Sequence, residues 1–91
     1  MDVSIISPVF NEKDNLEPFI NQVSAALNKE AWKWELILVD DGSDDGSFDL
    51  LQELSESQKN LRIISLSKNF GQTSAIQAGF DNASGKYLVT L

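Results

Sequence analysis

Four aspartates gather within a short stretch directly after an apolar segment. The segment LILV, residues 36–39, is followed by Asp40, Asp41, Asp44 and Asp45. Carboxylates at the end of a strand can accept hydrogen bonds from a ribose hydroxyl or a base N–H, and their charge favours the N-terminus of a following helix. We assign ligand binding to Asp40 and Asp41, which adjoin the apolar segment. Asp44 and Asp45 are assigned to turning the chain and capping the helix.

A second group of residues with binding chemistry follows the first apolar segment, VSIIS at residues 3–7. Pro8 fixes the exit from this segment, Phe10 can stack on a flat ring, and Glu12 can accept a hydrogen bond from a nucleoside. Taken alone, these residues also suit a plain loop that leads into a helix. Their pairing with Asp40 and Asp41 on the next apolar segment favours a nucleoside site.

Two other kinds of site share features with the acidic stretch. Residues 41–52 approach the spacing of an EF-hand calcium loop, but the twelfth position is Gln52 rather than a bidentate Glu. The segment before it is also rich in β-formers instead of helical. A phosphoacceptor receiver domain would need a lysine after a later strand, and the sequence offers none there. Both alternatives are therefore disfavoured.

The composition limits the chemistry further. The chain has no cysteine and no histidine, which excludes disulfides, thiolate nucleophiles, histidine bases and the usual zinc sites. Fourteen acidic residues against seven basic ones give a net charge of −7, which argues against nucleic acid as a partner. Any reaction must use carboxylates, hydroxyls, amides, lysine or arginine.

The elements that must position these residues can be read from hydrophobic periodicity. Compact apolar runs predict strands at residues 3–7, 34–39, 61–66 and 86–91, the first of them ending at Pro8. Helical spacing from Asp14 predicts a first helix with a capping box at Asp14 and Glu17 and with Pro18 in the first turn or at its edge. Its predicted buried face is Leu16, Phe19, Ile20, Val23 and Leu27.

Two further helices are predicted between the later strands. Phe48 to about Glu56 should bury Phe48, Leu51 and Leu54. The third helix should bury Ile76, Gly79, Phe80 and Ala83 and stop at Gly85 in a left-handed cap.

The strict alternation predicts one α/β domain over residues 1–91. Its order, βαβαβαβ, is typical of a Rossmann-like three-layer fold with a parallel sheet of about four strands and right-handed crossovers. Ligands of such sheets bind beyond the carboxyl ends of the strands. The loops SPVFNEKD, DDGSDDGS and SKNFGQTS are therefore expected to meet at one edge of the sheet.

Three blocks of the sequence carry a resemblance to a known family. SIISPVFNEKDNLEPFI, ELILVDDGSDDGS and LSKNFGQTSAIQAGFDNASGKYLVTL resemble the start of a family 2 glycosyltransferase. The likeness covers essentially the whole chain and is nearest to dolichyl-phosphate mannose synthase and bacterial polyprenyl-phosphate sugar transferases. It implies that residues 1–91 are the N-terminal, nucleotide-sugar-binding part of a GT-A domain. The parent enzyme would transfer a sugar from a nucleotide-diphospho-sugar to an acceptor such as a polyprenyl phosphate, in cell wall or polysaccharide biosynthesis.

The resemblance also implies roles for individual residues. Pro8, Phe10 and Glu12 would line the nucleoside pocket, with Asp41 at the base and Asp40 orienting the loop or ribose. Lys68, Asn69 and Gly71 would lie nearer the phosphates and the acceptor, where a cation and close backbone approach are useful. Relatives often have arginine at position 68, so Lys68 can equally be a solvated surface lysine.

The chain ends where relatives begin their metal motif. In the family an Asp-x-Asp motif after the fourth strand holds Mg²⁺ or Mn²⁺ against the donor diphosphate, whereas this sequence stops at Leu91. We therefore expect a truncated, inactive fragment without catalytic or metal-binding residues.

We expect it to be cytoplasmic, from a parent that works at the cytoplasmic face of the membrane. A non-catalytic nucleotide-binding or interaction module is the alternative. Apolar side chains near Tyr87, Val89 and Leu91 predict self-association.

Overall fold

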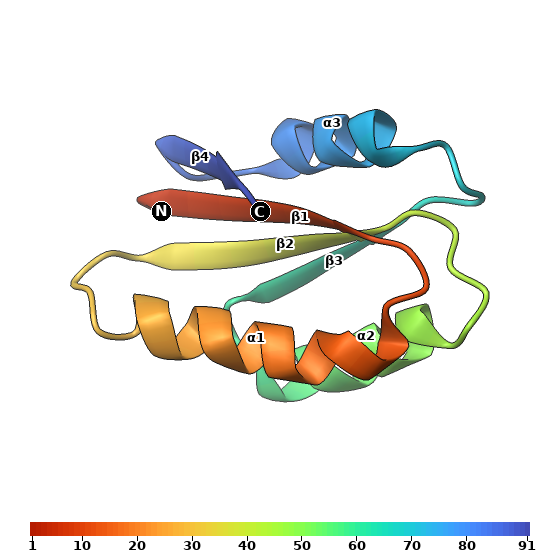
Figure 1. Cartoon of the computed structure of the whole chain (residues 1–91). Helices are drawn as coiled ribbons and strands as arrows, with labels where there is room; N and C mark the ends of the chain where they lie inside the picture. The colour runs from red at the N-terminus through yellow and green to blue at the C-terminus, as the bar shows by residue number, and fades with distance from the viewer.

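The structure is a computed structural model that describes all residues, 1–91. Strands and helices alternate throughout the chain (Figure 1). The elements are β1 (Val3–Val9), α1 (Lys13–Leu27), β2 (Trp34–Asp40), α2 (Ser47–Ser57), β3 (Leu61–Ser65), α3 (Gln72–Asn82) and β4 (Tyr87–Thr90). The predicted βαβαβαβ order is confirmed.

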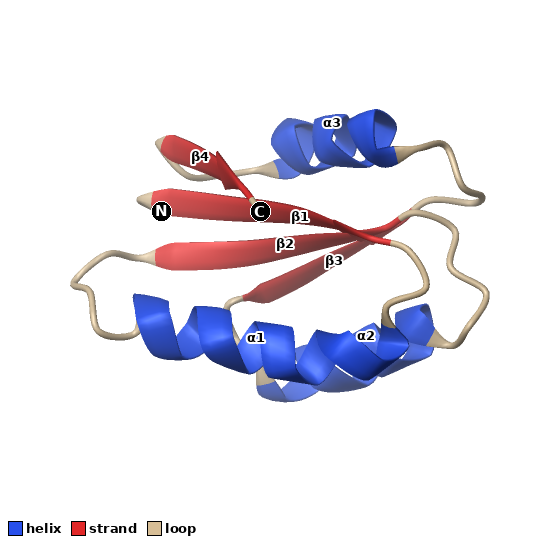
Figure 2. Ribbon diagram, in the orientation of Figure 1, coloured by secondary structure: helices blue, strands red, loops and turns tan.

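All strand pairs are parallel, and the sheet has the order β3-β2-β1-β4. Helices α1 and α2 cover one face and α3 covers the other, which gives three layers (Figure 2). The chain moves outward from β1 to β3 and then crosses to the far side of β1. The loops after β1, β2 and β3 consequently meet at the carboxyl edge of the sheet, as predicted.

Strand β2 forms the centre of the core, since all seven of its residues are buried. Its side chains alternate between two apolar clusters because successive residues of a strand point to opposite faces. Leu36 and Leu38 pack with Leu16, Ile20 and Leu51 beneath α1 and α2. On the other face, Ile37 and Val39 pack with Ile6 and Ala75 beneath α3. Each fully buried leucine, isoleucine or valine side chain contributes about 1.5–3 kcal/mol relative to an exposed one.

Strand β1 is longer than the sequence predicted. It continues through Pro8 to Val9, with Pro8 in register with Val39 of β2. The Ile6 carbonyl accepts a hydrogen bond from the Leu91 amide on the β4 side, so the Pro8 nitrogen two residues later faces that side too. The paired residues of β4 end at Thr90, opposite Ile6. No ladder bond is therefore lost at Pro8.

Helix α1 also differs from its prediction. It begins at Lys13 rather than Asp14, and no side chain caps it at Glu12, so the predicted capping box is wrong. Pro18 is consequently the sixth helical residue and lies in the second turn instead of the first. The cause is a contact from another loop, because the Lys13 amide donates to a carboxylate oxygen of Asp45.

Helix α3 and its exit correct two predictions. The helix buries Ala75 and Gly79, whereas Phe80 is exposed. It ends at Asn82, before Gly85, and Gly85 has no positive φ. A Cβ at Gly85 would lie 2.6 Å from the Ser4 nitrogen, so this glycine is needed for close approach to β1 and not for a left-handed cap.

Strand β4 is the exposed edge of the sheet. Tyr87, Val89 and Leu91 are 70 %, 43 % and 58 % exposed, as the sequence predicted. Beside this strand lies a depression of about 250 Å³ with an entirely apolar lining. Its residues are Val3, Ile5, Val23, Ala26, Leu27, Trp32, Val89 and Leu91.

Candidate functional site

The candidate site is a depression of about 340 Å³ at the carboxyl edge of the sheet. It is lined by residues of the β1–α1 loop, the β2–α2 loop and the β3–α3 connection. The lining residues are Pro8, Phe10, Glu12, Asp41, Asn69, Gly71 and Gln72. A smaller depression of about 240 Å³ also includes Pro8 and Glu12 but otherwise lies between β1 and α1.

The site brings together most of the residues that the sequence singled out. Pro8, Phe10, Glu12, Asp41, Asn69 and Gly71 all line the depression, while Asp40 and Lys68 do not. Gln72 was missed, although it stands at the start of α3 directly after Gly71. Its place at the end of a loop already marked as polar was the signal that could have identified it.

Phe10 and Glu12 form the exposed side of the depression. Phe10 is 46 % exposed, so its ring is free to stack on a planar ligand. One oxygen of Glu12, Oε2, accepts a hydrogen bond from Asn15 Nδ2 at 2.8 Å. The other carboxylate oxygen has no hydrogen bond within the protein and can accept one from a ligand.

Asp41 lies deeper, with a side chain that is only 3 % exposed. Oδ1 accepts a hydrogen bond from the Phe70 amide at 2.8 Å, and Oδ2 accepts one from the Gly71 amide at 3.0 Å. Its own amide donates to the Val9 carbonyl at 2.8 Å. Asp41 thus joins the ends of β1 and β2 to the start of α3.

Asp40 is oriented differently from Asp41. As the last residue of β2 it lies on the same face as Leu38, beneath α1 and α2. It is 2 % exposed, and its Oδ1 has no hydrogen-bond partner. Its carbonyl accepts a hydrogen bond from the Leu66 amide, which fixes the exit of β3. The role of Asp40 at a ribose stays a prediction.

Lys68 and Phe70 project from the β3–α3 connection. The Lys68 Nζ lies 5.2 Å from the centre of the Phe70 ring, within the range of a cation–π interaction. Both side chains are exposed. Gly71 has φ +103°, and no heavy atom lies within 4 Å of the position that a Cβ would occupy, so its pocket side is open.

Hydrogen bonds within the protein join the β1–α1 loop to the β2–α2 loop. The Asn11 amide donates to the Ser43 hydroxyl at 2.9 Å, and the Asp44 amide donates to Asn11 Oδ1 at 2.9 Å. Asn11 has φ +51°, a conformation that asparagine tolerates better than most residues. These contacts hold the chain on either side of Phe10 and Glu12.

Asp45 connects the starts of two helices. Its Oδ2 accepts the Lys13 amide of α1, and its Oδ1 accepts the amide and hydroxyl of Ser47 in α2. The hydrogen bond from the Ser47 hydroxyl lowers the pKa of the Asp45 carboxyl, and the two backbone amides lower it further. These contacts agree with the turn role predicted for Asp45. The predicted cap is wrong, because the N-cap of α2 is Gly46 and no side chain caps the helix there.

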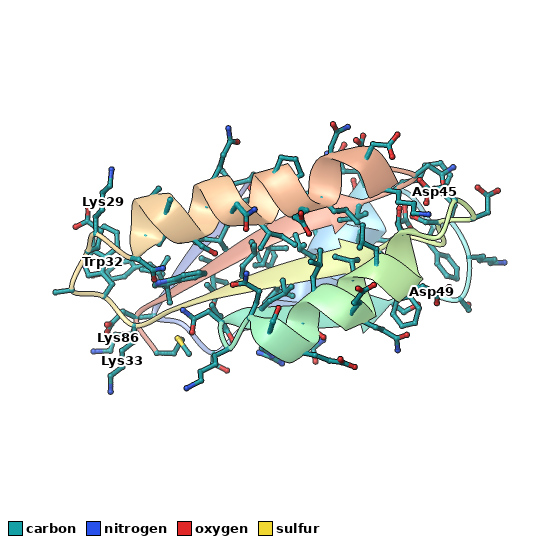
Figure 3. The ribbon with its side chains drawn as sticks, turned by 90° about the horizontal axis from the view of Figure 1, so that it is seen from below. Lys29, Trp32, Lys33, Asp45, Asp49 and Lys86 are labelled. Carbon is teal, nitrogen blue, oxygen red and sulfur yellow. The ribbon has the colours of Figure 1, made fainter.

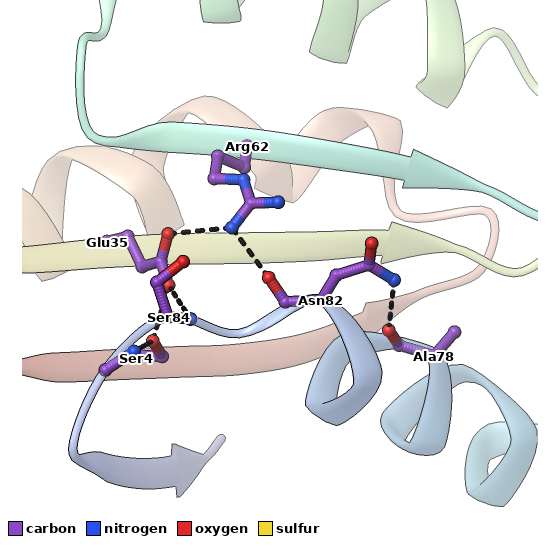
Figure 4. Close-up of polar contacts among 7 residues, drawn as sticks. Ser4, Glu35, Arg62, Ala78, Asn82 and Ser84 are labelled. Atoms are coloured by element: carbon purple, nitrogen blue, oxygen red, sulfur yellow. Dashed lines mark hydrogen bonds and ion pairs between the residues drawn. The ribbon is translucent and has the colours of Figure 1, made fainter. Parts of the chain in front are cut away.

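A second polar cluster lies at the opposite, amino end of the sheet (Figure 4). The buried Glu35 of β2 accepts hydrogen bonds from the Ser4 hydroxyl, the Ser84 amide and Arg62 Nη1. Arg62 also donates to the Asn82 carbonyl at 2.8 Å. Burial raises the pKa of Glu35, but these hydrogen bonds outweigh it and leave the pKa below its ordinary value. Sequence analysis missed this cluster, although a lone carboxylate inside WELILV was its signal.

The residues labelled in Figure 3 lie in two groups at opposite ends of the sheet. Lysines gather with Trp32 at the end where strands β1 and β2 begin, and labelled acids lie at the end that carries the candidate site. The labelled residues are Lys29, Trp32, Lys33 and Lys86 at the first end, and Asp45 and Asp49 at the second.

No three histidine, cysteine or acidic residues of the chain lie close enough together to hold a metal ion. In particular, both oxygens of Asp41 are already engaged by backbone amides. None of the helices combines the length and apolar character needed to cross a membrane.

A parallel sheet in the order β3-β2-β1-β4, with a polar depression beyond the ends of β1 and β2, defines a Rossmann-like α/β protein. Comparison with known families makes the assignment narrower. The model of the family described as "Glycosyl transferase family 2" matches residues 4–91. The chain belongs to this family.

Two curated relatives are similar to the chain over nearly all of its length. One is a dodecaprenyl-phosphate galacturonate synthase from Rhizobium johnstonii, 40 % identical over 100 % of this chain and 27 % of the relative. The other is an undecaprenyl-phosphate 4-deoxy-4-formamido-L-arabinose transferase from Pectobacterium atrosepticum, 45 % identical over 99 % of this chain and 28 % of the relative. The chain therefore spans little more than a quarter of these relatives.

Solved structures of two other proteins share the fold. TarS residues 1–349 from S. aureus superpose with a TM-score of 0.82 at 21 % identity, covering 100 % of this chain and 27 % of that TarS chain. A structure of the same TarS residues in complex with UDP-GlcNAc gives the same TM-score and identity, with 26 % of that chain covered. A mannosyltransferase from Pyrobaculum calidifontis, in complex with GDP-Man and Mn²⁺, gives 0.80 at 20 % identity over 94 % of this chain and 25 % of that enzyme. The predicted GT-A type of fold is confirmed.

Proposed function

We propose that residues 1–91 are the N-terminal, nucleotide-sugar-binding part of an enzyme that transfers a sugar from a nucleotide-diphospho-sugar to a polyprenyl phosphate. The names of two relatives support the acceptor, and the UDP-GlcNAc and GDP-Man complexes of the structural neighbours support the donor. The acceptor would place the parent at a membrane, and lipid-linked sugars of this kind are used in cell wall and polysaccharide biosynthesis.

The observation that carries this proposal is the depression at the ends of β1 and β2. It presents a stackable ring at Phe10 and a free carboxylate oxygen at Glu12 within one hollow. Its volume of about 340 Å³ lies at the lower end of the range for ligand pockets, roughly 300–1,000 Å³. We assign it to the nucleoside, with Pro8 and Asp41 at its inner side and Asn69 and Gly71 towards the diphosphate.

The metal site and the reaction centre of the parent are assigned to residues outside this chain. A divalent ion such as Mg²⁺ or Mn²⁺ would neutralise the leaving diphosphate in the parent. The chain has no group of ligands that fits such an ion. Lys68 is the cationic residue of the β3–α3 connection, and we assign it to the phosphate or acceptor side of the site. On this basis residues 1–91 alone should bind a nucleotide weakly and transfer no sugar.

Nucleotide titration tests the site. We expect UDP or GDP at millimolar concentration to shift the NMR amide signals of Phe10, Glu12 and Asp41. Phe10→Ala should weaken binding about 5-fold to 100-fold, because stacking of a base on an aromatic ring contributes roughly 1–3 kcal/mol. Phe80→Ala is the matched control, since Phe80 is an exposed aromatic residue of α3 outside the depression. Shifts confined to the lysine end of the sheet, or equal losses in both variants, would contradict the assignment.

Self-association of the chain through β4 is a separate proposal. Exposed β4 is an unpaired sheet edge with apolar side chains, and such edges pair with other chains. We expect dimers or larger species in light scattering at high protein concentration. Val89→Lys should shift the distribution towards monomers because it adds charge to that edge. A monomer across the whole concentration range would refute self-association.

A further inference from the structure

We propose that Asp41 is a positioning residue, which holds the β3–α3 connection in place as one wall of the nucleotide pocket. Nucleotide affinity would then depend on Asp41 through the position of this connection. The inference rests on the proposed nucleotide-binding function and adds to it a role that contact with the base alone would not require.

The hydrogen bonds of residues 67–71 support this role. Only the Phe70 and Gly71 amides of this segment have an acceptor, and in both cases the acceptor is the Asp41 carboxylate, at 2.8 and 3.0 Å. Hydrogen bonds to a charged acceptor are roughly twice as strong as those between neutral groups. Since Asp41 is 3 % exposed, water competes little for these oxygens.

Packing next to Asp41 also supports a positioning role for this residue. A Cβ at Gly42 would overlap the backbone of Lys68 and Asn69, so the two loops are in direct backbone contact. The Asp41 amide is itself bonded to the Val9 carbonyl of β1. The connection is thus fixed to the two central strands through one residue and its neighbour.

The residues that line the depression show which part of the site depends on the position of the β3–α3 connection. Asn69 and Gly71, the neighbours of Phe70 in the sequence, line the depression together with Phe10 and Glu12 of the first loop. Phe70 itself is 51 % exposed and does not line the depression, so its side chain does not hold the wall in place. Release of the two amides would let the wall move away from the first loop and widen the site.

Hydrogen exchange of the unaltered chain gives the first test. In the absence of nucleotide, we expect slow exchange of the Phe70 and Gly71 amides and fast exchange of the Lys68 and Asn69 amides. This measurement needs no variant and no ligand. Equal, unprotected exchange at all four positions would overturn the proposal.

The Asp41→Asn variant gives the second test. Its amide nitrogen cannot accept a hydrogen bond, so we expect exchange at Phe70 or Gly71 to become at least about tenfold faster, while Ile37 and Val39 of β2 stay protected. UDP affinity should fall about tenfold, the order expected when a charge-assisted hydrogen bond is lost. Asp44→Asn is the control, because Asp44 contributes only its backbone amide to the loop contacts, and it should change neither quantity.

The outcomes separate this inference from the proposed function. Weaker UDP binding in Asp41→Asn with unchanged exchange at Phe70 and Gly71 would mean that Asp41 acts by direct contact, which overturns the positioning role. Faster exchange with unchanged affinity would overturn it as well. If the unaltered chain binds neither UDP nor GDP, the proposed function fails, and the exchange pattern alone decides whether Asp41 holds the connection.

Discussion

Replacing Gly42 with alanine is expected to destabilise the chain by about 2–5 kcal/mol. Gly42 has φ +72°, where a Cβ costs roughly 1–2 kcal/mol. The added atom would also overlap the backbone of Lys68 and Asn69, and overpacking of this kind typically costs 1–3 kcal/mol. Backbone cannot swing aside as a side chain can, so the two loops would have to separate. Urea unfolding followed by tryptophan fluorescence measures the loss.

Gly46→Ala is the matched control for this prediction. Gly46 also has a positive φ, +90°, so alanine there carries a similar conformational cost. Its Cβ would meet only the flexible end of Lys13, with Nζ at 3.3 Å. We expect Gly42→Ala to be less stable than Gly46→Ala by more than about 1 kcal/mol, the lower bound of the overpacking cost. Equal stabilities would show that the contact between the loops is not tight.

Glu35→Ala is expected to lower the free energy of unfolding at pH 7 by about 2–4 kcal/mol. The change leaves the Ser4 hydroxyl, the Ser84 amide and Arg62 without their common acceptor. Removing one member of a buried ion pair costs roughly 3–5 kcal/mol, and the partial exposure of Arg62 reduces that figure. Glu30→Ala is the control, because the exposed Glu30 side chain makes no hydrogen bond or ion pair. A loss no larger than in Glu30→Ala would contradict the prediction.

The effect of Glu35 should depend on pH in a defined direction. Its pKa is lower in the folded chain than its ordinary value, so its contribution is fully present above about pH 4.5. That contribution is lost as the pH falls through the pKa of the folded state. The stability difference between the unaltered chain and Glu35→Ala should therefore be constant from pH 7 to about pH 5 and narrow below pH 4.5. A difference that widens on acidification would contradict the assigned pKa direction.

The fold was predictable because its signals are local. Compact apolar runs separated by helical spacing define the four strands and three helices, and parallel order follows from the lengths of the connections. The same rule brought Glu12 and Asp41 to one edge of the sheet, where the structure places them around one depression. The errors in this part concern the ends of elements and Phe80, which was predicted to be buried and is exposed.

The missed features depend on partners far away in the sequence. The start of α1 is set by Asp45, and the exit of β1 could extend through Pro8 because β4 pairs no further than Thr90. Glu35 lies in an apolar run and gains its partners only when Arg62 and the chain after α3 reach it. Periodicity carries no information about such contacts. The orientation of Asp40 away from the depression is different, because it follows from strand alternation, which places Asp40 on the same face as Leu38.

The hydrogen bonds that join the three loops affect how a ligand would enter the site. Asn11 with Asp44, Lys13 with Asp45, and Asp41 with Phe70 and Gly71 are all joined before any nucleotide is present. Ordering a free backbone costs about 1–2 kcal/mol per residue. In this protein the three loops become ordered during folding, before a nucleotide binds. A nucleoside would consequently enter a cleft whose shape changes little, with association limited by diffusion and orientation rather than by loop closure.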